Sequence, residues 1–283
     1  MSQDANWDSY LWPSDAGAGK MMLRNLYGVH NVEELLRREY AETTDRAWEI
    51  ESGEVKIPST GDLTEWQALH GHLLGGVYSW AGELRTVRFT QGDGHYFLNP
   101  DHFEECIPLV FDSVRDLDWA SLTRFQFIDH AARFHMLLNW VHPFREGNGR
   151  ATRLFLDRQI ASAPYALDYS RVDADRWNAA AMASRPTTYV WPSNHMPLVS
   201  VFNEITIRAD APAGSLDPLN PLDLQQIIDN ARHPGTSGQD IAATIGAAIP
   251  GQEQIIGSTL STDRSDADER DSPLTAPDLD SGL

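Results

Sequence analysis

Several side chains that can do phosphate chemistry stand close together between residues 141 and 153, in the segment VHPFREGNGRATR. His142 is the one group in this segment that can accept a proton near neutral pH, so it is the candidate general base. Glu146 can hold a magnesium ion, because magnesium prefers carboxylate and phosphate oxygens. The segment therefore combines a candidate base with a candidate metal ligand.

Glycines and arginines in the same segment suit a polyphosphate. Gly147 and Gly149 allow the backbone to come close to a ligand, and the N-terminus of a helix attracts phosphate. Arg150 and Arg153 are three positions apart, so both project from one side of the first helical turn, where guanidinium groups can bind phosphate oxygens. We expect the phosphates of a nucleotide at the helix end, with a metal ion bridging them and His142 facing the reacting phosphorus.

Two apolar helical patterns flank this polar segment and must position it. One precedes the segment over residues 125–138, and the other follows it over residues 154–160. The polar residues are therefore predicted to form a tight loop between two buried helices, with Gly147 to Gly149 opening the second helix.

The segment resembles the signature of Fic (Fido) proteins at every constrained position: His142, Phe144, Glu146, Gly147, Asn148, Gly149, Arg150 and Arg153. A second run, from Trp80 to Arg85 (WAGELR), is similar to one that precedes a β-hairpin in this family. The resemblance covers about residues 60–208. It implies a mainly α fold, a helical bundle with one β-hairpin flap.

This resemblance implies transfer of AMP from ATP to a Tyr, Thr or Ser hydroxyl of a target protein. His142 would deprotonate the hydroxyl, and Glu146 would bind Mg²⁺. The backbone near Gly147 and Gly149, with the Asn148 side chain, would stabilise charge on the α-phosphate. Arg150 and Arg153 would neutralise the outer phosphates. Phe144 would plug into the core to fix the loop, and Arg145 receives no role.

A flap is expected over residues 86–98. Two strand-like runs, 87–90 and 95–98, surround a sequence that is typical of a turn. In relatives the edge of this hairpin pairs with an extended target segment, which is β-strand addition. The residues expected to dock the target are Thr90, Gln91, Gly92, Asp93, Gly94 and His95.

Two further features of the resemblance concern reaction type and regulation. Gly149 favours nucleotidyl transfer, because a subgroup resembling the phage toxin Doc has lysine there and transfers phosphate. Many relatives carry an inhibitory Ser/Thr-x-x-x-Glu-Gly/Asn helix whose glutamate pairs with the second motif arginine. Ser79 with Glu83 and Ser200 with Glu204 have this spacing, but Leu84 and Ile205 follow them. The chain thus looks like the toxin subgroup, whose inhibitor is a separate small antitoxin protein.

Two other functions stay open beside an AMP transferase. One is a Fic enzyme that uses another donor and transfers, for example, UMP. The other is a binding module that keeps the fold without turnover.

Other titratable residues are predicted to be structural. His70 and His72 are two apart and point in different directions on a helix, so one of them lines a pocket or caps a polar contact. His130 and His135 are five apart, which does not match a zinc-protease pair, and His135 is expected to be a hydrogen-bonded core histidine. Cys106 is expected to be a small buried residue, and residues 15–20 to be a flexible turn and not a phosphate loop.

The composition restricts the partners. The formal net charge is −19, which disfavours binding to nucleic acid and to anionic membranes. A single cysteine and a polar, acidic first segment lead us to expect a cytoplasmic protein, with secretion by a route without a cleaved signal left open.

The chain is expected to divide into three parts. Residues 1–59 form an N-terminal helical extension, with Asn31 capping a helix that carries Val32, Leu35, Leu36 and Tyr40. Residues 60–208 form the catalytic domain, with helices over about 62–77, 99–114, 121–141, 147–161, 176–184 and 196–207. Residues 209–283 form a low-complexity, largely disordered acidic tail.

Overall fold

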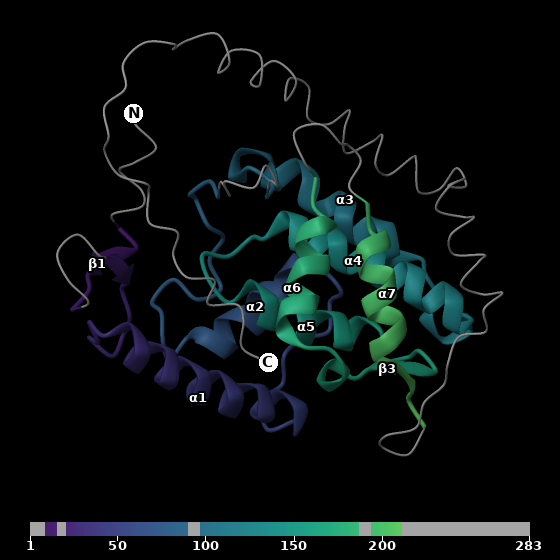
Figure 1. The fold of residues 1–283 in the computed structure, drawn as a ribbon, viewed down its shortest axis with the longest axis horizontal. Coiled ribbons are helices and arrows are strands. Elements are labelled where there is room, and N and C mark those ends of the chain that lie inside the picture. Colours follow the sequence, from purple (N-terminus) through teal and green to yellow (C-terminus); the bar gives the residue numbers. More distant parts are fainter. Residues whose placement is uncertain (1–8, 16–20, 90–96, 187–193, 211–283) are drawn as a thin grey trace, which may run out of the picture.

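The computed structural model describes residues 9–15, 21–89, 97–186 and 194–210, and within them the chain is mainly helical (Figure 1). Two short antiparallel strand pairs accompany the helices, β1 (Leu11–Pro13) with β2 (Met21–Leu23), and β3 (Tyr165–Leu167) with β4 (Thr206–Arg208). The helices are α1 (Val32–Glu51), α2 (Leu63–Leu74), α3 (Phe103–Arg115), α4 (Arg124–Val141), α5 (Asn148–Gln159), α6 (Ala174–Ala183) and α7 (Met196–Ile205).

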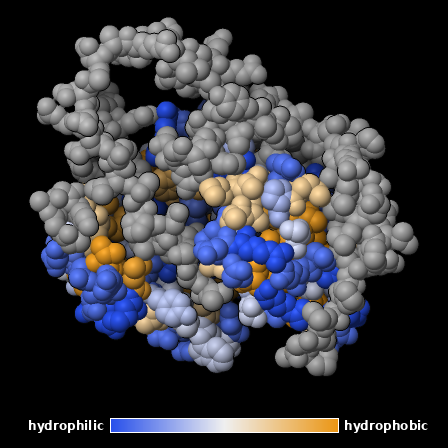
Figure 2. Space-filling model, viewed as in Figure 1, coloured by the Kyte–Doolittle hydropathy of each residue, from blue (hydrophilic) through white to orange (hydrophobic). Residues whose placement is uncertain are grey.

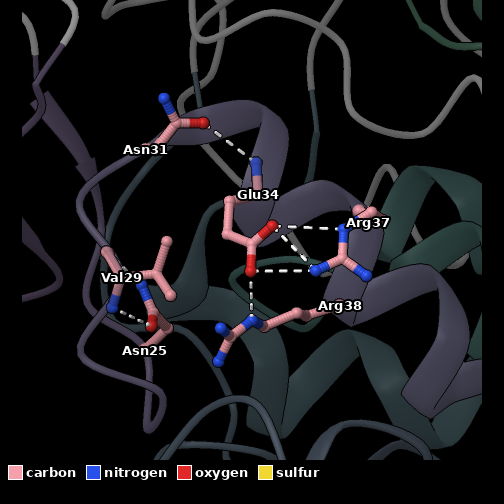
Figure 3. A network of polar contacts seen from close by, with 6 residues as sticks. All are labelled: Asn25, Val29, Asn31, Glu34, Arg37 and Arg38. Atoms are coloured by element: carbon pink, nitrogen blue, oxygen red, sulfur yellow. Dashed lines mark hydrogen bonds and ion pairs between the residues drawn. The ribbon is translucent and has the colours of Figure 1, made fainter.

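Helix starts follow the capping residues. The Asn31 side chain accepts a hydrogen bond from the Glu34 backbone N–H at 3.0 Å, and the Glu34 carboxylate in turn accepts from Arg37 and Arg38 (Figure 3). Asp62 caps α2 in the same way, through the N–H of Thr64. These contacts confirm the predicted starts of α1 and α2.

Helix α4 lies inside the bundle, packed by α3, α5 and α7 (Figure 1). Thr123 and Gln126 form a capping box at its start. Most of its residues from Phe127 to Val141 are buried, whereas Asp129, His130, Arg133 and Asn139 are only half-buried. Its buried residues are Phe127, Ile128, Ala131, Ala132, Phe134, His135, Met136, Leu137, Leu138, Trp140 and Val141.

The N-terminal part shares one hydrophobic core with the rest of the bundle. Helix α1 packs on α2, and Leu35, Ile50, Met22 and Leu23 belong to the same buried cluster as the central helices. Of the apolar residues that the sequence places on this helix, Leu35 is buried, whereas Tyr40 is 56% exposed. The buried stripe of α1 instead runs through residues four apart: Leu35, Glu39 and Thr43.

The last core helix differs from the prediction, and parts of the predicted flap and tail lie outside the described residues. The last core helix ends at Ile205, earlier than predicted, because Thr206 to Arg208 pair with β3 as strand β4. Residues 87–89 and 97–98 are described without strand assignment, whereas the tip of the predicted flap, 90–96, lies outside the described residues. Residues 16–20 and the predicted tail from 211 onward also lie outside them.

Hydrophilic and apolar residues alternate on the coloured parts of the face in Figure 2. Among the described residues, no helix combines the length and the hydropathy that crossing a membrane requires.

Candidate active site

The polar segment forms the turn from α4 to α5, as the flanking patterns predicted. His142 ends α4 with a left-handed backbone (φ 44, ψ 60), and its N–H donates to the Leu138 carbonyl at 3.1 Å. Gly147 is also left-handed (φ 75), and α5 begins at the next residue. A Cβ at Gly147 would lie 2.2 Å from Leu74 Cδ1, so this position needs glycine for its space as well as for its φ.

Asn148 and Phe144 fix the shape of the turn. Asn148 Oδ1 accepts from the Phe144 N–H, and Asn148 Nδ2 donates to the Phe144 carbonyl, both at 2.9 Å. The Phe144 ring is fully buried between Trp66 and His70. Phe144 is thus the plug that was expected. Both amide atoms of Asn148 are engaged within the turn, so this side chain clamps the loop.

His70 supports the same turn from α2. Its Nε2–H donates to the Glu146 carbonyl at 2.8 Å, and its Nδ1 accepts from the Gly82 N–H at 2.8 Å. Burial lowers the pKa of His70 to about 4, with a smaller effect of Arg150 in the same direction. The neutral ring that these two bonds require is therefore the stable form. This is the polar contact that was predicted for one of the two α2 histidines.

Aromatic rings enclose the candidate base. The ring centroid of Phe97 lies 3.9 Å from that of His142, and the Phe89 centroid lies 5.7 Å away. Burial holds the pKa of His142 well below its usual value, and the charges of Arg85 and Arg185 lower it further. The imidazole is consequently neutral at pH 7, as a general base must be.

The two motif arginines have different surroundings. Arg150 forms an ion pair with Glu39 of α1 and donates from Nη1 to Thr43 Oγ1 at 3.3 Å. The other oxygen of Glu39 accepts from the Tyr78 hydroxyl. Sequence reasoning missed Glu39, although its four-residue spacing from Leu35 was a usable signal.

Arg153 lies beside a half-buried acid and a tyrosine. Its guanidinium is 5.9 Å from the Tyr169 ring centroid, and the Tyr169 hydroxyl donates to Asp157 at 3.0 Å. Burial raises the pKa of Asp157 to about 7, although the hydrogen bond from Tyr169 and the charge of Arg153 act to lower it. Within the described part of the chain, Arg153 makes no ion pair.

The carboxylates once considered as inhibitory partners of Arg153 lie elsewhere. Glu83 is exposed, and Glu204 forms an ion pair with Arg176. Neither contacts Arg153 in the described structure.

Glu146 is a plausible ligand for one magnesium ion only in combination with substrate oxygens. Its Oε1 accepts from the Gly147 N–H at 2.9 Å, so the carboxylate lies at the start of α5. No group of three metal-binding side chains occurs among the described residues. One carboxylate plus phosphates is a common way for proteins to bind magnesium, so the donor set fits this ion.

Two residues behave differently from expectation. His135 is buried against Trp177, but its Nδ1 has no hydrogen-bond partner in the described structure. The predicted burial is therefore confirmed, whereas the predicted hydrogen bond is not seen at Nδ1. Arg145 received no role, yet it is buried, with its guanidinium 5.5 Å from the Phe89 ring and 5.8 Å from the Tyr10 ring. Cys106 is buried and free, as predicted.

Comparison with known proteins agrees with this geometry. The sequence of residues 61–160 matches the Fic/DOC family. A probable protein adenylyltransferase Fic of Salmonella typhimurium is 31% identical over 173 residues, which cover 61% of this chain and 82% of that protein. The chain belongs to the Fic/DOC family. The protein adenylyltransferase VbhT of Bartonella schoenbuchensis is 31% identical over 164 residues, which are 58% of this chain and 34% of VbhT.

The fold is also that of solved Fic proteins. BepC of Bartonella tribocorum, crystallised with bound AMPPNP, superposes with a TM-score of 0.60 at 23% identity, covering 72% of this chain and 98% of BepC. The match to the family begins at residue 61, whereas Glu39 and Thr43 lie before it on α1. Helix α1 therefore supplies part of the wall of this Fic site.

Proposed function

We propose that this Fic protein is a protein adenylyltransferase, which transfers AMP from ATP to a Tyr, Thr or Ser hydroxyl of another protein. The observation that carries the proposal is the intact Fic turn, where a neutral His142 stands beside the start of α5. The relatives that share the family are named adenylyltransferases, and BepC was crystallised with an ATP analogue.

In this mechanism, His142 accepts the proton of the target hydroxyl. The hydroxyl oxygen forms a bond to the α-phosphorus, and the bond from that phosphorus to the bridging oxygen of pyrophosphate breaks. The first N–H groups of α5, around Gly149, would hold the α-phosphate oxygens, because these groups lack helical acceptors. A magnesium ion held by Glu146 would supply positive charge to the phosphates.

The arginines act on the leaving group. Arg150 and Arg153 project from the first turns of α5 and would neutralise charge on the outer phosphates. Phe144 and Asn148 would act indirectly, by holding the turn in shape. Residues 90–95 would dock the target by strand addition.

Glycine at position 149 supports nucleotidyl transfer over phosphate transfer. The positions of Glu83 and Glu204 support inhibition by a separate antitoxin protein, which would make this chain the toxin of a pair. A cytoplasmic location remains our prediction from the sequence.

The proposal can be tested by incubating the protein with a cell extract and ATP labelled at either the α- or the γ-phosphate, followed by mass spectrometry of labelled proteins. We expect protein label from the α position only. Label from the γ position alone would show kinase chemistry. Label from UTP in place of ATP would identify a UMP transferase, and no label from any nucleotide would favour a binding module.

A further inference from the structure

Arg85 is a buried arginine whose guanidinium group donates hydrogen bonds to backbone carbonyl groups. Its side chain is 1% exposed. Nε donates to the carbonyl of His142 at 2.6 Å, and Nη2 donates to that of Val141 at 3.3 Å. Nη1 donates to the Val87 carbonyl at 2.7 Å, and Nη2 also donates to the Leu98 carbonyl at 2.6 Å.

These four carbonyl groups belong to two parts of the site. Val141 and His142 are where α4 ends and the candidate base takes its left-handed backbone. Val87 and Leu98 are the two ends of the segment that carries the expected target-docking residues. One guanidinium therefore joins the backbone of the base to both ends of the docking segment.

Backbone hydrogen bonds run alongside this junction. The Arg85 N–H donates to the Pro143 carbonyl, and the Leu98 N–H donates to the Trp140 carbonyl, both at 2.8 Å. These two bonds hold the segments that contain Arg85 and Leu98 against the end of α4 and the turn that follows it. They leave the carbonyls of Val141 and His142 to Arg85, because both lie beyond the last helical acceptor of α4.

Burying this charge is costly, and the described structure offers no carboxylate within ion-pair distance of Arg85. Besides the carbonyls, the guanidinium meets the ring faces of Phe89 at 4.6 Å and Phe103 at 5.0 Å. Burial lowers the pKa of Arg85 to about 9, and Arg145 contributes in the same direction. A lysine could keep the charge but could not reach four carbonyls in two directions, since it lacks the planar fork.

We propose that Arg85 is a positioning residue that fixes the backbone of His142 relative to Val87 and Leu98, so that the imidazole stays where a target hydroxyl can reach it. The proposal rests on the proposed transfer reaction. Arg85 itself touches neither nucleotide nor hydroxyl. Its loss should slow transfer while leaving ATP binding on α5 intact.

Arg85→Lys tests this, with Arg124→Lys as the matched control. Arg124 is half-buried and, like Arg85, donates to backbone carbonyls, those of Asn203 on α7 and Thr206 on β4, but it lies at the opposite end of α4. We expect Arg85→Lys to lower kcat by about 100-fold, the effect of a displacement of about 1 Å in a reacting group, with ATP affinity within about threefold of wild type. Arg124→Lys should change neither kcat nor the affinity for ATP. A kcat within about threefold of wild type in Arg85→Lys, or a loss of ATP affinity as large as the loss of kcat, would overturn the proposal.

A second measurement does not depend on activity. The His142 ring lies against Phe97, so its NMR signal is displaced by the aromatic ring current, and it can be assigned by its absence in His142→Ala. We expect this signal to move toward that of a free histidine in Arg85→Lys and to stay in place in Arg124→Lys. An unmoved signal in Arg85→Lys contradicts the proposal even if the wild type transfers no AMP, whereas absent transfer with a moved signal counts against the proposed function alone.

If Arg85→Lys does not fold, Phe103→Leu removes one ring face from the guanidinium and so weakens its hold on the four carbonyl groups. The His142 signal should then move in the same direction by a smaller amount. A signal identical to wild type in Phe103→Leu would count against the proposal.

Discussion

Arg150 at the start of α5 is paired with Glu39 on α1, a residue 111 positions earlier in the chain. The Glu39 side chain is only 3% exposed, and its second oxygen accepts from Tyr78. The pair ties a helix outside the family match to an arginine of the motif. It therefore makes α1 a structural part of the candidate active site.

Replacing Glu39 with alanine should destabilise the protein strongly. The change leaves the Arg150 charge without its buried partner, which typically costs about 3–5 kcal/mol. Glu42→Ala is the matched control, because Glu42 pairs with Arg46 nearer the surface of the same helix, where a pair contributes about 1 kcal/mol or less. Urea unfolding measures both. Equal effects of the two substitutions would show that the Glu39 pair is no more than a surface contact.

The buried histidines should make stability depend on pH below neutrality. Burial lowers the pKa of His70 to about 4 and that of His135 to about 3. Above pH 6.5 neither the folded nor the unfolded chain binds these protons. As the pH falls below 6.5 the unfolded chain takes them up first, so each histidine removes about 1.4 kcal/mol of stability per pH unit, down to its folded pKa.

Unfolding measured between pH 7 and pH 5 checks this slope. His135→Gln should reduce it by the contribution of one proton. A slope that is the same in wild type and His135→Gln would mean that His135 is protonated in the folded protein.

Transfer activity should persist well below pH 6.5. The pKa of His142 is held low by burial and then by the charges of Arg85 and Arg185, so the base stays unprotonated in mildly acidic solution. Phe97→Ala exposes the ring, which should raise this pKa and move the acid limb of the pH–rate profile upward. A wild-type acid limb at pH 6.5 or above would disagree with the enclosed base.

Asp157→Asn should stabilise the protein at neutral and higher pH. The folded pKa of Asp157 is raised to about 7, so its ionisation opposes folding and stability is lost as the pH rises from about 3.8 to 7. Asparagine can still accept from Tyr169 and carries no charge. We expect a gain of about 4 kcal/mol at pH 8 and a negligible gain at pH 4, measured by urea unfolding. An equal change at both pH values would exclude an ionisation effect.

The sequence predicted the parts of this molecule that depend on local chemistry. Asn31 and Asp62 cap helices where expected, and the glycines at 147 and 149 place the turn between α4 and α5. These features depend on neighbouring residues, which a sequence displays directly. The burial of Phe144 was expected from the resemblance to Fic proteins, and the structure confirms it.

Contacts between distant residues were not predicted. The Arg85 fork binds carbonyl groups, which every residue has, so no pattern in the sequence marks its partners. The four-residue spacing of Glu39 from Leu35 places it on the buried stripe of α1, but nothing in the sequence marks Arg150, 111 positions later, as its partner. Tyr40 is part of the apolar pattern of α1 but is exposed, because the buried stripe passes through its neighbour Glu39.

The central claim is that His142 in the α4–α5 turn takes the proton during transfer of AMP. The most direct test is a single-turnover measurement of label passing from α-labelled ATP to the target, by wild type and His142→Ala at equal ATP occupancy, with His72→Ala as control. We predict that His142→Ala binds ATP as wild type does and transfers no label, while His72→Ala transfers it at the normal rate. Continued transfer by His142→Ala would contradict the account.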